Sequence, residues 1–215
     1  MSFAGERVLC VTSHPDDETI GCGATLARAA REGAAVRTYL PFRRLDVAGR
    51  GAWDEAVARF RRASAILGAQ AVLSEPMPAE RDVWSAPHLL AEALAPHLEW
   101  STLVITHWHG DVHQAHRVVS QAVEIGTRPF RLRRRVLQCE IPTSSDQSFV
   151  RSFTPGLFVI VDAGDARRKL EAMACYPQEH APGRSPSTLD RWMQVRGEQI
   201  GVERAEAFAV ARWYL

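Results

Sequence analysis

The sequence lacks several features that would assign it to a special class of protein. Its four cysteines, Cys10, Cys22, Cys139 and Cys175, are scattered and form no CxxC pair, so no disulfide framework is indicated. No apolar run reaches the roughly 20 residues that a transmembrane helix needs, and the start of the chain shows no signal-peptide pattern. We therefore expect a cytoplasmic protein with reduced thiols and no membrane partner.

The sequence also lacks an excess of charge of either sign. Its 26 Lys and Arg residues balance 25 Asp and Glu residues, which leaves a formal net charge of +1. A neutral chain offers no basic field to nucleic acid and has no acidic excess of the kind that favours disorder, so we expect no nucleic-acid partner. The 215 residues show no repeats, low-complexity segments or linkers. Because this length can bury a sizeable core, we expect one domain over residues 1–215.

Short apolar runs alternate with amphipathic segments along most of the chain. Residues 7–13 form an apolar run, a glycine pair and a helical pattern follow, and a second apolar run covers residues 35–42. This β-α-β order indicates parallel strands joined by a right-handed crossover. The predicted fold is an α/β three-layer α/β/α sandwich with a Rossmann-like, mostly parallel sheet.

The remaining elements are predicted from the same alternation. Further strands are expected at residues 69–75, from residue 101, at 134–141 and at 156–163. Further helices are expected at residues 52–68, 86–100 (interrupted near Pro96), 114–128 and 164–176. Residues 189–215 are expected to close the chain with a helix and an apolar end that packs on the core or on a neighbouring subunit.

Two of the predicted strands end in unusual polar side chains. The first strand is followed by His14, Asp16, Asp17 and Glu18, and the strand from residue 101 leads into His107, His109, Asp111, His113 and His116. Open parallel sheets bind their ligands at the carboxyl ends of the strands. The convergence of histidines and acids at this edge predicts a metal site.

The residue types and their spacing favour zinc. Imidazole and carboxylate are good Zn²⁺ ligands, and a catalytic site uses three of them and leaves a position for water. His14 and Asp17 are three residues apart, so both can point the same way while Asp16 points towards the water molecule. His116 at the start of a helix can supply the third ligand, and His113, nearly one turn earlier, is then free to act on the substrate. Fe²⁺ or Co²⁺ fits the same ligands.

The two motifs are also compatible with other interpretations. The HPDDE stretch is compatible with a solvated turn, because Pro and Asp favour turns and acids favour helix N-termini. Residues 107–113 are likewise compatible with a polar loop. Two strand ends that both carry histidines and acids and together complete one site are less expected by chance. A dinucleotide-binding loop is disfavoured because the G-x-G-x-x-G pattern fails at Leu26 and no acidic residue ends the second strand.

The motifs resemble those of a known enzyme family. The stretch SHPDDETIGCGATLARAAREGAAV, residues 13–36, resembles the signature of the zinc-dependent N-deacetylases of the LmbE-like, or PIG-L, family. THWHGDVHQAH, residues 106–116, is similar to the second motif of that family. RRKLEAMACYPQE, residues 167–179, is similar to its weaker third block, with Pro177 in place of a serine. The resemblance covers roughly residues 6–180.

The resemblance implies hydrolysis of an N-acyl group, usually an acetyl group on an amino sugar. It makes His14, Asp17 and His116 the zinc ligands, in agreement with the assignment from spacing. It also makes Asp16 the general base and His113 the group that stabilises the oxyanion or protonates the leaving amine. The expected substrate is an N-acetylated sugar or a sugar-bearing small molecule of secondary metabolism, as in antibiotic biosynthesis, and relatives of this kind assemble as homo-oligomers, which we expect here too.

The second motif departs from the family at one position. Ala115 stands where the family has an Asp beside the ligand histidine, and alanine cannot orient an imidazole. Either Asp111 or another acid takes over that task, or His113 is a weaker catalyst. Two further hypotheses therefore stay open: a zinc-binding relative without hydrolytic activity, and a hydrolase of another N-acyl amide.

Three residues outside the metal set are predicted to contact the substrate. Arg50, which shares a loop over the expected cleft with Arg43 and Arg44, is predicted to hold a sugar hydroxyl, a phosphate or a carboxylate. Trp108 is predicted to stack on a sugar face. Asp111 is predicted to contact the substrate from the second motif.

Overall fold

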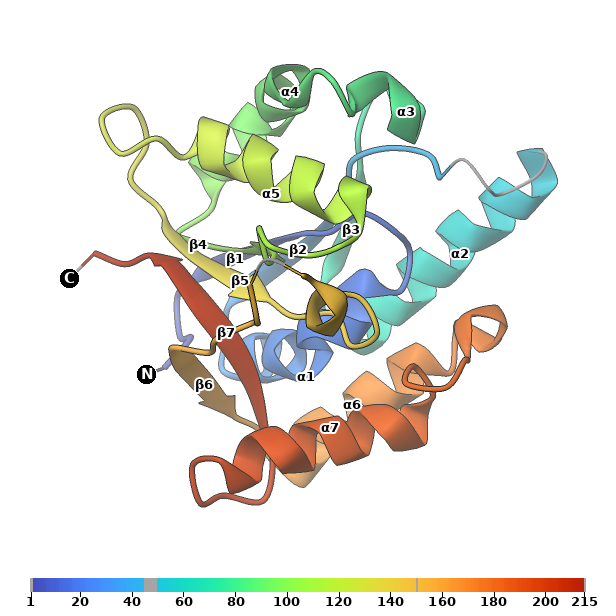
Figure 1. The fold of residues 1–215 in the computed structure, drawn as a ribbon, viewed down its shortest axis with the longest axis vertical. Coiled ribbons are helices and arrows are strands. Elements are labelled where there is room, and N and C mark those ends of the chain that lie inside the picture. Colours follow the sequence, from blue (N-terminus) through green and yellow to red (C-terminus); the bar gives the residue numbers. More distant parts are fainter. Residues whose placement is uncertain (1, 45–49, 150, 215) are drawn as a thin grey trace.

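A mixed sheet forms the centre of the computed structural model, which describes residues 2–44, 50–149 and 151–214 (Figure 1). Its seven strands lie in the order β3-β2-β1-β4-β5-β7-β6. The strands are β1 (Arg7–Val11), β2 (Ala35–Leu40), β3 (Gln70–Leu73), β4 (Leu103–His107), β5 (Arg135–Cys139), β6 (Leu157–Ile160) and β7 (Ala205–Arg212). β1 to β5 pair in parallel, and β7 runs antiparallel to both of its neighbours, β5 and β6.

Helices cover both faces of the sheet. They are α1 (Asp17–Arg31), α2 (Arg50–Ile66), α3 (Glu80–Val83), α4 (Pro87–Trp100), α5 (Gln114–Gly126), α6 (Ala163–Met173) and α7 (Pro186–Glu198), with the short 3₁₀ helices η1 (Ser145–Gln147) and η2 (Pro177–Glu179). In Figure 1, α3, α4 and α5 lie above the sheet, α1, α6 and α7 lie below it, and α2 lies at the right and packs against α6. The predicted three-layer α/β/α sandwich with a mostly parallel sheet is confirmed.

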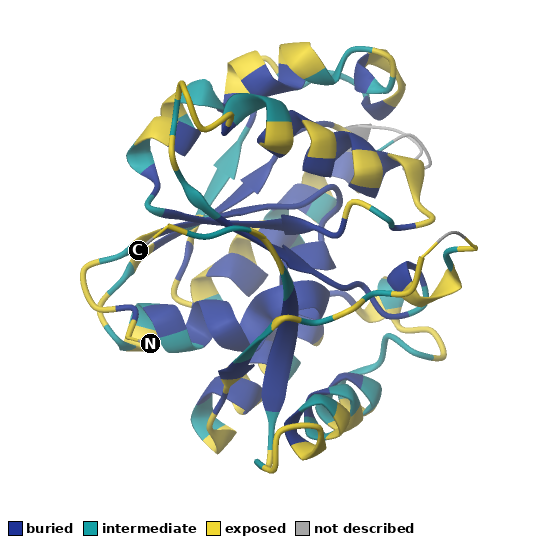
Figure 2. Cartoon of the chain, turned by 60° about the vertical axis from the view of Figure 1, so that its left-hand side comes forward, coloured by how far each residue is buried: buried dark blue, intermediate teal, exposed yellow. Residues whose placement is uncertain are grey.

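The central strands are apolar on both faces because each face meets a helical layer. Val8 and Cys10 of β1 point into the core shared with α1 and α6, whereas Leu9 and Val11 point into the core shared with α4 and α5. The strands at the centre of Figure 2 are accordingly buried between two helical layers whose outer faces are exposed. This burial on both faces explains why the parallel strands appear in the sequence as continuous apolar runs. Among the described residues, no helix combines the length and the hydrophobicity that a membrane crossing requires.

Three elements differ from their predicted form. The helix α4 continues through Pro96, whose exposed position lets water solvate the carbonyl group that loses its hydrogen-bond donor. The end of the chain is not a helix with an apolar tail, because residues 205–212 form β7 between β5 and β6. Helix α1 begins at Asp17, before the glycine pair, so the acids of the first motif belong to its first turn.

Helix α1 is interrupted at Cys22, where φ is −152° and ψ is 18°. The carboxylate of Glu206 from β7 accepts hydrogen bonds from the backbone amides of residues 24–25, at 3.1 and 2.7 Å. Lys169 from α6 donates to the Ile20 carbonyl at 2.8 Å and pairs with Glu206 at 2.5 Å. The backbone groups that the break exposes are therefore satisfied by one buried ion pair, as buried polar groups require.

Candidate metal centre and active site

His14, Asp17 and His116 meet at the carboxyl ends of β1 and β4. His14 lies in the turn after β1, Asp17 begins α1, and His116 lies in the first turn of α5. Asp17 Oδ2 is 3.3 Å from His14 Nδ1 and 3.4 Å from His116 Nε2, and all three side chains are buried. Ligand atoms of the three residues lie within 4.8 Å of one another. The structure thus brings together the three ligands predicted from the sequence.

Each of the two histidines has a second carboxylate at its other ring nitrogen. His14 Nε2 lies 3.6 Å from Glu80 Oε1, and His116 Nδ1 lies 3.2 Å from Asp111 Oδ2. Carboxylates at this position fix the tautomer of a ligating histidine and direct its free nitrogen at the metal. The ring nitrogens that face Asp17 are therefore the ones available to a cation.

The electrostatic environment of this cluster favours positive charge. Although burial acts in the opposite direction, the carboxylates of Asp17 and Glu80 raise the pKa of His14 to about 9. The carboxylates of Asp17 and Asp111 likewise raise the pKa of His116 against the effect of burial. A divalent cation fits the same field, and two imidazoles with one carboxylate form the three-ligand set of catalytic zinc sites.

His107 lies beside the cluster but is not free to bind a metal ion. Its Nε2 accepts a hydrogen bond from the Ser13 amide at 2.9 Å, which occupies the lone pair of that nitrogen. Its ring stacks on His116 with centroids 3.9 Å apart and planes at 4°. Burial lowers the pKa of His107 to about 4, with a further contribution from His116. We therefore assign His107 to the support of the His116 ring.

Asp16 occupies a strained position next to the ligands. Its φ is 121° and its ψ is −33°, a region that residues other than glycine rarely adopt. Its Oδ2 atom is buried and has no hydrogen-bond partner among the described residues. Burial, with the charge of Asp17, raises the pKa of the Asp16 carboxyl well above its ordinary value. A buried acid with an unpartnered oxygen beside a group of metal ligands is suited to the role of general base.

Glu18 and Tyr176 support the strained turn that contains Asp16. Glu18 Oε2 accepts a hydrogen bond from the Asp16 amide at 3.1 Å, and the Tyr176 hydroxyl donates to Glu18 Oε1 at 2.8 Å. The two side chains are fully buried, and burial raises the pKa of Glu18 to about 7. The last acid of the HPDDE motif therefore has a structural role in placing Asp16, and Tyr176 comes from the third sequence block.

His113 is exposed at the start of α5, 4.7 Å from His116 between ring centroids. The backbone amide of Ala115 donates to His113 Nδ1 at 3.2 Å, so the neutral ring carries its hydrogen on Nε2. His14, Glu80 and His113 also offer ligand atoms within 4.8 Å of one another. Because His113 Nε2 then carries a hydrogen, we assign the cation to the set with His116 and the donor role to His113.

The predicted substrate contacts have different outcomes. Trp108 is only 3% exposed, with Phe153 edge-on to its ring at 5.8 Å, so it packs in the interior and does not present a surface for a sugar. Both oxygens of Asp111 have protein partners, which include the hydroxyls of Ser144 and Ser145 and the amide of His113. The side chain of Arg50 lies outside the described residues, although its backbone begins α2.

Sequence reasoning missed two groups of residues in this site. Glu80 belongs to a short helix after β3, and no motif connects it with His14. Ser144 and Ser145 reach Asp111 from the loop after β5. Only the polar character of these loops pointed to a role, and that signal is shared by most loops.

Comparison with known proteins decides the family. The model of the PIG-L family, described as GlcNAc-PI de-N-acetylase, matches residues 9–125, a segment that contains both metal motifs. The chain belongs to the PIG-L family. This membership confirms the resemblance drawn from the first two motifs. No curated protein sequence matches the chain.

Solved structures of other proteins share the PIG-L fold of this chain. The conserved protein TT1542 from Thermus thermophilus is 24% identical with a TM-score of 0.75, over 98% of this chain and 96% of that one. The A40926 pseudoaglycone deacetylase Dbv21 is 18% identical with a TM-score of 0.73, over 98% and 99%. GalB from Pseudomonas putida KT2440, a 4-carboxy-2-hydroxymuconate hydratase, is 17% identical with a TM-score of 0.71, over 98% of both chains. Since one of the three is a hydratase, the shared fold does not decide the reaction.

Proposed function

We propose that the protein is a zinc-dependent hydrolase that removes the N-acetyl group from an amino sugar or a sugar-bearing small molecule. The observation that carries this proposal is the meeting of His14, Asp17 and His116 beside the unpartnered carboxyl oxygen of Asp16. A set of three metal ligands with an adjacent base is the arrangement that metal-assisted hydrolysis of an amide requires.

The geometry supports a division of roles among these residues. A bound divalent cation would polarise the acyl oxygen and lower the pKa of a water molecule to about 7. Asp16 accepts the proton of the attacking water on its unpartnered Oδ2. His113 presents its Nε2 hydrogen to the oxygen or the nitrogen on which charge develops, and its Nδ1 is held by the Ala115 amide. That amide gives the ring an orientation in place of the side chain that Ala115 lacks.

The nature of the substrate is supported by the family and by one structural relative. The family model is described by an N-acetylglucosamine-bearing lipid, and Dbv21 is named as a deacetylase of an antibiotic pseudoaglycone. The first description names an N-acetylated amino sugar, and the second names the deacetylation of an antimicrobial compound. We propose the same substrate class for this chain.

The test of the proposal is Asp16→Asn. Asn tolerates a positive φ better than most residues, so the turn is retained while the base is lost. We expect zinc content to stay stoichiometric and acetate release from N-acetylglucosamine conjugates to fall at least about 100-fold. Asp146→Asn, an exposed change in η1, is the matched control and should keep full activity. Normal turnover by Asp16→Asn would show that Asp16 is not the base.

A zinc-binding relative without hydrolytic activity is the second candidate. The observation that favours it is Ala115, because the family's acidic residue is missing at this position. A broad panel of N-acetylated sugars distinguishes the two. Zinc bound in full with no acetate or other acid released from any member would favour the binding protein, whereas release of a different acid would indicate another N-acyl amide as the substrate.

A further inference from the structure

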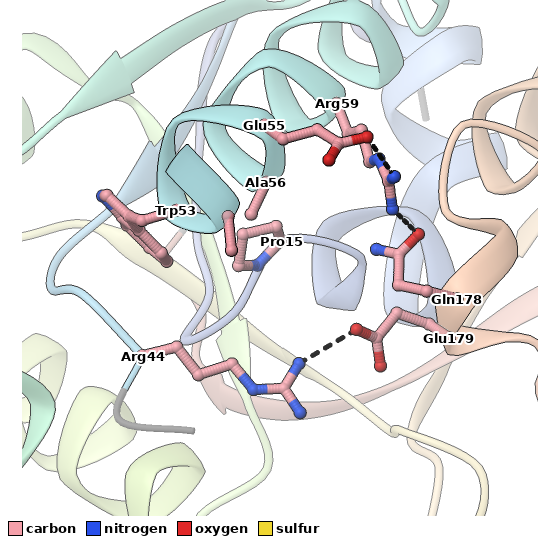
Figure 3. Close-up of a pocket in the computed structure, with 9 residues that line it drawn as sticks. Pro15, Arg44, Trp53, Glu55, Ala56, Arg59, Gln178 and Glu179 are labelled. Carbon is pink, nitrogen blue, oxygen red and sulfur yellow. Dashed lines mark hydrogen bonds and ion pairs between the residues drawn. The ribbon is translucent and has the colours of Figure 1, made fainter. Parts of the chain in front are cut away.

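A cavity of about 280 Å³ opens beside the turn that carries the catalytic residues (Figure 3). Pro15 contributes to its wall, and Pro15 lies between the ligand His14 and the proposed base Asp16. The opposite walls come from α2 and from η2. Its volume is near the lower end of the range for small-molecule pockets, so it can hold one sugar-sized group. Because Pro15 forms part of the wall, that group would lie next to the reacting centre.

Polar side chains from α2, η2 and the segment after β2 form an arc around this cavity (Figure 3). Arg44 Nη1 donates to Glu179 Oε1 at 3.1 Å, which joins the segment after β2 to η2. Arg59 of α2 donates to Glu55 on its own helix and to Gln178 on η2. Two guanidinium groups and two carboxylates thus face each other in pairs, so the charges of the described residues that line the cavity sum to zero.

The apolar part of the wall comes from Trp53 and Ala56 of α2. Trp53 is 9% exposed and packs with Phe60 and Leu40, so its position is fixed by the core. A pyranose ring has one apolar face and a rim of hydroxyl groups, and a cavity with the apolar groups of Pro15 and Ala56 on one side and alternating donors and acceptors on the other matches both.

We propose that this cavity binds the group attached to the amino sugar and selects a neutral, polyhydroxylated group over one that carries phosphate or carboxylate; the proposal rests on the proposed function of the adjacent site. Hydroxyl groups both donate and accept, so they can insert between the paired arginines and acids. An anion can only accept hydrogen bonds, so it finds no donor on the carboxylates of Glu55 and Glu179 and is repelled by their charge. The attraction of each arginine for the anion is offset because a carboxylate already pairs with that arginine. The basic residues near the cleft therefore do not make this a phosphate site.

Two substrates that differ in the group attached to the amino sugar test the selection. A disaccharide of N-acetylglucosamine and glucose, whose attached group is neutral and polyhydroxylated, is compared with N-acetylglucosamine 1-phosphate on the zinc-loaded enzyme. We expect kcat/KM to favour the neutral substrate at least about tenfold, and Glu179→Gln to reduce that preference about tenfold because it removes a carboxylate that repels the phosphate. Glu171→Gln, an exposed change on α6, is the matched control and should leave the ratio unchanged.

Binding of the deacetylated products separates the two proposals. Calorimetry with the disaccharide of glucosamine and glucose and with glucosamine 1-phosphate reports on the cavity without any hydrolysis. If the neutral product binds more tightly and Glu179→Gln narrows the difference while no acetate is released, the cavity proposal holds and the hydrolytic function is wrong. If acetate is released but the phosphate is preferred, or the ratio does not respond to Glu179→Gln, the cavity proposal is wrong. Failure of both sugars to bind and to react would overturn both.

A second variant tests the location. Ala56→Leu adds bulk to the wall away from the metal cluster. We expect it to raise KM for the neutral conjugate about tenfold with little change in zinc content, and to leave binding of acetate, the other product, unaffected. Equal KM values for the wild type and Ala56→Leu would place the bound sugar elsewhere.

Discussion

Both metal-site histidines lie between two carboxylates, and this arrangement decides which nitrogen of each ring is free. His14 lies between Asp17 and Glu80, and His116 lies between Asp17 and Asp111. Because Asp17 is shared, the two free nitrogens converge on one carboxylate oxygen. The rings are therefore oriented before a metal ion arrives, and a cation that binds displaces the protons that these carboxylates stabilise on the imidazoles.

The first residue-scale prediction concerns Asp111. Asp111→Asn keeps the shape of the side chain but removes the charge that faces His116 Nδ1. We expect the affinity for Zn²⁺ to fall about 10- to 100-fold, as for other carboxylates that orient a ligating histidine. Competition with a zinc chelator measures it, with Asp146→Asn as the control. An unchanged affinity would show that Asp111 does not orient His116.

The metal ligands could be predicted from the sequence, but their supports could not. His14 and Asp17 are close in the chain, and the position of His116 after a second strand followed from the parallel sheet. Glu80 and Tyr176 meet this site only through the path of the chain between strands, which no local pattern specifies. The burial of Trp108 could not be predicted either, because sequence proximity to the motif does not reveal on which side of the backbone a ring packs.

At the scale of secondary-structure elements, the break in α1 depends on one buried ion pair. Lys169 and Glu206 are each 3% exposed at the side chain and hold the two sides of the break. Lys169→Met would leave Glu206 buried without its cation, so we expect the free energy of unfolding to fall by about 3–5 kcal/mol. Urea denaturation measures the change.

Two further variants make this prediction specific. Arg167→Met, a change on the exposed face of the same helix, should cost less than about 1 kcal/mol. The double variant Lys169→Met/Glu206→Gln removes both charges and should recover part of the loss. A single Lys169→Met protein as stable as Arg167→Met would show that the pair does not support the break.

The strands of the parallel half could be predicted because burial on both faces produces unbroken apolar runs. β7 could not, because its alanine-rich sequence has high helix propensity and only pairing with β5 and β6 makes it a strand. The start of α1 was placed too late because glycines normally interrupt helices. In this helix Gly21 is required by packing, because an added Cβ at that position would lie 2.7 Å from Cys139 Sγ.

At the scale of the whole molecule, the proposed metal ion would join two parts of the fold that are built from distant segments. His14 and Asp17 belong to the β1–α1 unit, whereas His116 belongs to α5 on the opposite face of the sheet. The apolar cores on the two faces exist without the cation, because their residues are buried against the sheet. We therefore expect the metal-free protein to be folded but less stable.

Chelation tests this expectation. With free Zn²⁺ at 1,000 times its Kd, binding to the folded state contributes about 4 kcal/mol, which corresponds to roughly 10 °C in Tm for a chain of this length. We expect a chelator to lower Tm by about that amount while the far-UV circular dichroism spectrum at 25 °C stays the same. His116→Ala should abolish the zinc-dependent shift, and His88→Ala, an exposed change on α4, should retain it. A wild-type Tm that does not respond to zinc would show that this site binds no zinc. A shift that survives in His116→Ala but is lost in His88→Ala would place the zinc site elsewhere on the molecule.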